Sequence, residues 1–157
     1  MNTIIEDFLE LKEILNSFNG LEKKYNWLLT DLDWAYPESY LDYFMGYRNN
    51  GHNNIYLITG ENLKKLANMN GVYFIWGVFS AIPKNEIVDL DKIKVEPYAD
   101  GNPGFWMGNP AIQHPKASVE LVLWDSTLVV LLSKDDGLSS NFRNTFNGWN
   151  DLNLYNQ

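Results

Sequence analysis

Residues 118–133 constrain the fold of this chain more than any other segment. They form two apolar runs rich in valine and leucine, which meet at Asp125-Ser126, a dipeptide suited to a tight turn. This pattern predicts a β-hairpin. Because both faces of each run are mostly apolar, we expect the hairpin to lie in the middle of a sheet that is covered on both sides.

An amphipathic helix is predicted over residues 3–19, at the amino terminus. Thr3 and Glu6 fit a capping box, and Asn19-Gly20 is a typical helix end. Between these signals, five apolar residues recur at helical spacing and would form one stripe. They are Ile4, Phe8, Leu11, Leu15 and Phe18.

The rest of the chain predicts a single α+β domain over residues 1–157. Strands are expected at 25–34, 55–59 and 72–82, where Gly77 indicates a bulge or a close backbone approach. Short helices are expected at 61–69 and 138–146, and Pro37 opens another short helical segment. We therefore predict a mainly antiparallel sheet of about four to six strands, with the amino-terminal helix and shorter helices packed on it.

The charge of the chain limits its partners. The 157 residues include 12 basic and 20 acidic ones, for a net charge of −8. A domain this acidic repels nucleic acids and anionic membranes, whereas a basic protein partner is favoured. The absence of cysteine excludes disulfides and thiol chemistry. No secretory signal and no membrane-spanning apolar run is recognisable, so we predict a cytoplasmic protein.

The segment 98–115 is the main candidate for partner binding. It is rich in glycine and proline, and a loop of this length in a small domain is functional or poorly ordered. Aromatic side chains on loops often anchor partners. An alternative stays open, in which the segment folds back over the sheet as a lid. The predicted binding residues are Tyr98, Asp100, Phe105, Trp106 and His114.

Two weaker patterns keep an enzyme open as an alternative. Asp31 and Asp33 would share one face of a strand and could hold a divalent ion. Asp100 and His114 could pair as a general base in a pocket under residues 98–115. No serine elbow, phosphate-binding loop or zinc motif is present, and we expect no cofactor. The leading hypothesis is a non-enzymatic binding protein, and a third reading is a structural or regulatory subunit that dimerises.

Residues 37–51 carry a resemblance to a known family. Pro37-Glu-Ser-Tyr-Leu-Asp-Tyr-Phe44, followed by Asn49-Asn-Gly51, resembles the helix and turn of the SUKH superfamily. The resemblance implies a small α+β protein that acts as an immunity protein and neutralises a bacterial toxin. Separately, the segments 74–80, 98–106, 113–115 and 123–126 are similar to uncharacterised small bacterial proteins, which implies no activity.

Overall fold

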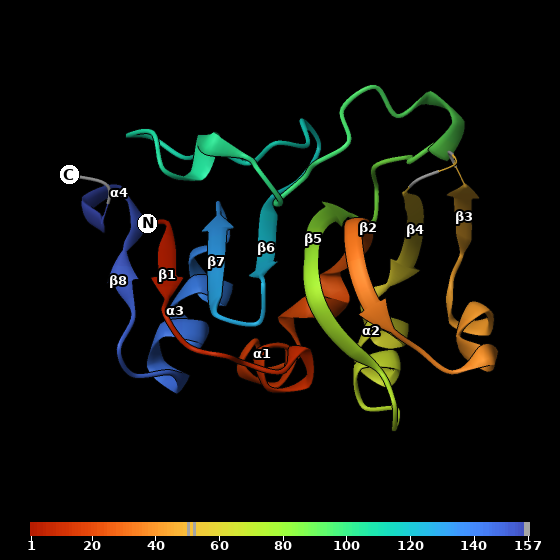
Figure 1. The fold of residues 1–157 in the computed structure, drawn as a ribbon, viewed down its shortest axis with the longest axis horizontal. Helices are drawn as coiled ribbons and strands as arrows, with labels where there is room; N and C mark the ends of the chain where they lie inside the picture. Colours follow the sequence, from red (N-terminus) through yellow and green to blue (C-terminus); the bar gives the residue numbers. More distant parts are fainter. Residues whose placement is uncertain (50, 52, 156–157) are drawn as a thin grey trace.

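The computed structural model describes residues 1–49, 51 and 53–155, and this part of the chain forms one open antiparallel sheet of eight strands with four α-helices. The strand order is β3-β4-β2-β5-β6-β7-β1-β8 (Figure 1). The strands are β1 (Thr3–Ile5), β2 (Tyr25–Ala35), β3 (Gly46–Asn49), β4 (Asn54–Thr59), β5 (Tyr73–Pro83), β6 (Val119–Trp124), β7 (Leu128–Ser133) and β8 (Asn150–Asp151).

The predicted hairpin is confirmed as β6 and β7. The two strands pair from Val119 with Ser133 to Trp124 with Leu128. Asp125 and Ser126 form the turn, with φ angles of 49° and 51°. Strand β5 lies on one side of the hairpin and β1 on the other, so the hairpin occupies the interior of the sheet and is buried on both faces.

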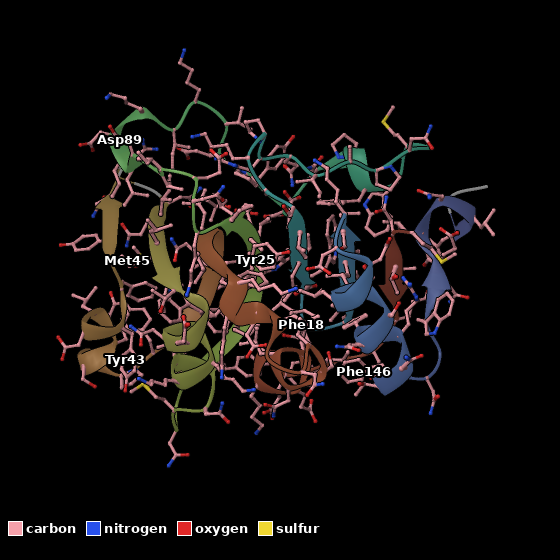
Figure 2. The ribbon with its side chains drawn as sticks, turned by 180° about the vertical axis from the view of Figure 1, so that it is seen from behind. Phe18, Tyr25, Tyr43, Met45, Asp89 and Phe146 are labelled. Carbon is pink, nitrogen blue, oxygen red and sulfur yellow. The ribbon has the colours of Figure 1, made fainter. Side chains whose placement is uncertain are left out.

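Three helices cover one face of the sheet. They are α1 (Leu11–Ser17), α2 (Gly60–Ala67) and α3 (Asp136–Thr145), and Figure 2 shows them on the near side. Phe18, at the end of α1, stacks on Trp27 of β2 at 6.3 Å between ring centroids and lies 6.2 Å from Phe142 of α3. These rings join the helical layer to the sheet in the largest of the three hydrophobic clusters.

The opposite face is covered by the connection between β5 and β6. In this layer Ala99 and Phe105 pack against Val78, Val122 and Val130 of the central strands. A second group, formed by Val88, Leu90, Ile93 and Ile112, packs against a cluster of Leu28, Ile55, Ile82 and Ala117. The connection runs along one end of the sheet in Figure 1 (green to teal). Leu152 of α4 (Leu152–Tyr155) completes this layer.

The prediction of one amphipathic helix over residues 3–19 is wrong. Thr3–Ile5 forms β1, which pairs with residues 129–131 of β7, and α1 begins only at Leu11 with a capping box between Glu10 and Glu13. Three consecutive residues of β1 are buried, which a single helical stripe cannot achieve. The backbone of β7 needs a partner on its free edge, and the β-branched Thr-Ile-Ile sequence suits a strand.

The prediction of four to six strands is also wrong. The strands that it omits are β1, β3 and β8, which have two to four residues each and lie at or near the ends of the sheet. Strands of two to four residues are too short to show an apolar alternation in the sequence. They are recognised only by their pairing with a neighbouring strand. The strands expected at 25–34, 55–59 and 72–82 and the helices at 61–69 and 138–146 are confirmed, with small shifts at their ends.

Gly77 lies opposite the irregular part of β2, which changes register between Thr30 and Asp33. A Cβ atom on Gly77 would lie 2.7 Å from the Leu32 side chain, so the close neighbour is a side chain and not the backbone. Pro37 precedes a 3-10 helix, η2 (Glu38–Tyr43), as the local sequence suggests. Among the residues in the described ranges, no helix combines the length and the apolar character needed to cross a bilayer.

Candidate functional site

The segment 98–115 is held on the sheet and does not project as an arm. Its first residues are fixed by β2, where Asp31 Oδ2 accepts hydrogen bonds from the Ala99 N–H at 2.7 Å and the Asp100 N–H at 3.0 Å. The Thr30 hydroxyl donates to the carbonyl oxygen of Pro97 at 2.6 Å. Ala99 is fully buried, so the Asp31 carboxylate satisfies a backbone donor that water does not reach.

A buried carboxyl group fixes the end of the segment. Glu120 of β6 accepts hydrogen bonds from the backbone N–H of Gln113 at 2.9 Å and from its side-chain amide at 2.8 Å. Burial raises the pKa of Glu120, and the hydrogen bonds from Gln113 and from the backbone of His114 offset only part of this effect. The sheet therefore supplies carboxyl oxygens as acceptors at both ends of the segment.

Two amides close the segment on itself. Gln113 Oε1 accepts hydrogen bonds from the Tyr98 N–H and from the Asn102 side chain, both at 3.1 Å. Asn102 Oδ1 in turn accepts from the Gly104 N–H at 2.9 Å. Of the two readings that the sequence leaves open, the geometry matches a lid over the sheet.

The predicted binding residues of this segment differ in their exposure. Phe105 is only 2% exposed, and its ring lies edge-on to Trp124 at 6.0 Å. Trp106 is half-buried and lies 5.1 Å from the same indole. Tyr98 and Asp100 are exposed. Phe105 thus packs on the sheet and has no surface to offer a partner, and of the predicted aromatics Tyr98 is the most exposed, at 46%.

The two aspartates of β2 have different surroundings. Asp31 has a φ of 51° and lies where the register of β2 shifts, so its carboxylate turns toward residues 99 and 100. Asp33 is exposed and lines a different hollow from Asp31. The prediction that the two carboxylates share a face and could hold an ion stays a prediction. In the described part of the chain, no group of three or more histidine, aspartate or glutamate residues is placed to hold a metal ion.

His114 does not pair with Asp100. The His114 ring is buried, and its Nδ1 accepts a hydrogen bond from the Lys116 N–H at 3.3 Å. Burial lowers the pKa of His114, and the nearby Lys116 lowers it further. No hydrogen bond joins His114 to Asp100 within the described ranges, so the predicted general-base pair is not formed. His52 and Asn50 lie outside the described residues.

A different region carries four exposed apolar side chains that lie close together in the chain. It lies at the outer end of the sheet, where η2 leads into the edge strand β3, and we call it the β3-end surface. Figure 2 shows Met45 and Tyr43 at this end, far from Phe146. The β3-end surface consists of Tyr36 (45% exposed), Leu41 (42%), Met45 (55%) and Tyr47 (57%), with Asp33 and Asp42 beside them in the chain.

The rings behind this surface are well packed. Trp34, at the end of β2, stacks on Phe74 with 5.0 Å between centroids and an interplanar angle of 7°. Tyr40 meets the same indole edge-on at 5.2 Å, and Tyr56 of β4 does so at 5.8 Å. Two of the exposed rings contact this aromatic cluster, because Tyr36 lies 3.9 Å from Tyr40 and Tyr47 lies 6.3 Å from Tyr56 between centroids.

The electrostatics and the strand edge add to this surface. Between Tyr25 and Tyr47 the sequence contains four acidic residues and no lysine or arginine. Strand β3 pairs with β4 on one side, and its other edge faces away from the rest of the sheet. Arg48, which follows, is paired with Glu96 and also donates to the Leu90 carbonyl oxygen at 2.6 Å.

Sequence reasoning missed this surface, although a signal was present. Six aromatic residues lie between positions 34 and 47, a higher density than in the segment 98–115. That count does not say which rings are exposed, because η2 and β3 are recognisable only in the folded chain. Comparisons with known proteins do not assign the surface either: no family model, no curated protein and no solved structure matches the chain.

Proposed function

We propose that this protein is a non-enzymatic protein-binding domain and that its β3-end surface docks a basic protein. The observation that carries the proposal is the concentration of four exposed apolar side chains beside acidic residues at the outer end of the sheet. Large apolar groups that stand together on a surface are a feature of interaction sites.

The chemistry of the surface favours a partner rich in lysine or arginine. Tyrosine rings and methionine supply the apolar contact that dominates binding energy, and carboxylates around them select positive charge. The net charge of −8 steers a basic protein from a distance. A second copy of this acidic chain would be repelled by the same field, which disfavours the dimeric subunit.

The immunity role belongs to this proposal. The resemblance to the SUKH superfamily rests on residues 37–51, and the β3-end surface is built largely from that segment. We propose that the partner is a basic bacterial toxin that this protein holds inactive in the cytoplasm. An enzyme receives less support, because the Asp31 carboxylate is hydrogen-bonded to the backbone of residues 99 and 100, and no hydrogen bond joins Asp100 to His114 among the described residues.

Co-purification with the product of the neighbouring gene tests the proposal. The double variant Met45→Ala/Tyr47→Ala should weaken the complex by roughly 30-fold or more, as expected for anchors that contribute about 2 kcal/mol. The matched control is Ile87→Ala/Met107→Ala, which removes two exposed apolar side chains elsewhere and should leave the affinity unchanged.

Charge is tested separately. Asp33→Asn/Asp42→Asn should slow association at low salt and reduce its salt dependence, whereas the control Asp91→Asn/Asp125→Asn should have a smaller effect. Absence of any complex would contradict the immunity role. Equal weakening by Met45→Ala/Tyr47→Ala and by its control would contradict the location of the surface.

A further inference from the structure

We propose that a cavity between residues 87–95 and 114–116 binds a small amphipathic carboxylate. The cavity lies in the connection between β5 and β6, next to the 3-10 helix η3 (Leu90–Lys92), and Figure 2 shows Asp89 at its position beyond β3 and β4. Its volume is about 330 Å³, within the range of small-molecule sites. The inference does not rest on the proposed function, because none of its residues belongs to the β3-end surface.

Most of the cavity wall is apolar. Val88 and Ile93 pack against the hydrophobic cluster formed by Leu28, Ile55, Ile82 and Ala117, so this part of the wall is held by the core. Ile87 and Val95 line the cavity and are exposed. An alkyl or aromatic group that enters the cavity would therefore replace water at apolar surface on several sides.

The charges around the cavity are mainly positive. Lys92, Lys94 and Lys116 line it, together with the single carboxylate of Asp89. Lys92 pairs with Asp89 at 3.0 Å, and Lys116 pairs with Glu86 at 3.2 Å.

Lys94 differs from the other two lysines. It is exposed, and it forms no ion pair or side-chain hydrogen bond with any residue that the structure describes. Three of the 12 basic residues of an acidic chain thus surround one apolar cavity, and one of them has its charge unpaired. A single negative charge on the ligand matches this arrangement.

His114 supplies a neutral donor at the same cavity. Because Nδ1 accepts the hydrogen bond from the Lys116 N–H, the neutral ring carries its proton on Nε2. No described residue is hydrogen-bonded to Nε2, and the ring lines the cavity. One oxygen of a carboxylate would accept a hydrogen bond from the Nε2–H of His114, and the other would accept one from the ammonium group of Lys94. A phosphate is less suited, because it carries more charge and the cavity offers few further donors.

Calorimetric titration of the full-length protein with octanoate tests the proposal. Octanoate should bind saturably, and octanol, which has the same chain without the charge, should bind about tenfold more weakly. Lys94→Met should weaken octanoate binding about tenfold and leave octanol binding unchanged. Lys65→Met, which removes one exposed and unpaired lysine on α2, is the matched control and should behave as the wild type.

The position of the ligand is tested with two further measurements. Ile87→Asp should abolish octanoate binding, whereas Met107→Asp, an equally charged change at another exposed apolar site, should not. In imidazole NMR spectra, assigned with the His114→Gln variant, octanoate should shift the His114 signals. Equal affinity for octanoate and octanol, equal loss in Lys94→Met and Lys65→Met, or unmoved His114 signals would each overturn the proposal.

Discussion

Two aromatic regions of this protein differ in how far their side chains are buried. The segment 98–115 lies against the sheet, where Phe105 and Trp106 pack on Trp124. Hydrogen bonds to the carboxyl groups of Asp31 and Glu120 hold its backbone at both ends. The β3-end surface has a denser set of rings, yet four large apolar side chains there remain exposed. Aromatic content alone therefore does not distinguish an anchor for a partner from a part of the core.

The two regions differ in burial because the sheet offers them different packing partners. The segment 98–115 crosses the central strands, which offer valine side chains and the carboxylates of Asp31 and Glu120 as acceptors. The β3-end surface lies at the last strand, with one neighbouring strand to pack on. A residue at the end of a sheet has fewer contacts available, so part of its apolar area stays in water.

The largest effect is expected from truncating the two regions at matched positions. Phe105→Ala should lower the free energy of unfolding by about 3 kcal/mol, because it empties a buried site between the segment and the sheet. Tyr47→Ala, at an exposed position, should change it by about 0.5 kcal/mol or less. Urea denaturation measures both. Similar losses in the two variants would contradict the contrast drawn above.

A smaller effect is expected at Asp31. Asp31→Ala should lower the free energy of unfolding by about 2 kcal/mol, because the buried Ala99 N–H loses a charged acceptor. Asp31→Asn keeps an oxygen acceptor and tolerates the positive φ, so its loss should be smaller. Asp33→Ala is the control and should be nearly neutral. Hydrogen exchange at Ala99 should quicken only in the Asp31 variants.

The pH dependence of stability gives the smallest and most specific test of the lid. Burial and Lys116 lower the pKa of His114 in the folded protein below the ordinary value of 6.5. The unfolded chain then binds more protons, so the wild type should lose stability as the pH falls below 6.5 and through the folded-state pKa.

His114→Gln should remove this contribution and flatten the curve of unfolding free energy against pH in that window. Denaturant titrations at several pH values between 7 and 5 measure it. A variant whose slope equals that of the wild type would indicate that His114 is solvated and that the end of the segment is not held on the sheet.

Much of the fold could be predicted where a segment is long enough for its apolar residues to indicate its structure. The hairpin at 118–133 and the strand at 72–82 are long and apolar on both faces, so their burial follows from their composition. The prediction failed at Ile4, where the local sequence pattern and the long-range pairing disagree. Its spacing to Phe8 and Leu11 matches a helix, but its burial in the structure comes from pairing with Val130 of β7, which no local pattern reveals.

The candidate sites show the same limit. Asp31 lies in a confirmed strand, but its positive φ at a register shift and its hydrogen bonds to the backbone of residues 99 and 100 are visible only in the folded chain. His114 was a candidate from its residue type, whereas its cavity depends on residues 87–95, some twenty positions away in the chain.

The amino-acid sequence by itself determined the acidic charge, the α+β class and the central strands, because these follow from composition and from periodicity within short segments. The tertiary structure decided which aromatic rings are exposed, where the chain adds β1, β3 and β8, and that a lysine-rimmed apolar cavity forms. These features arise from contacts between segments far apart in the chain. Whether a residue is buried at such a contact depends on the segment that packs against it as much as on the residue itself.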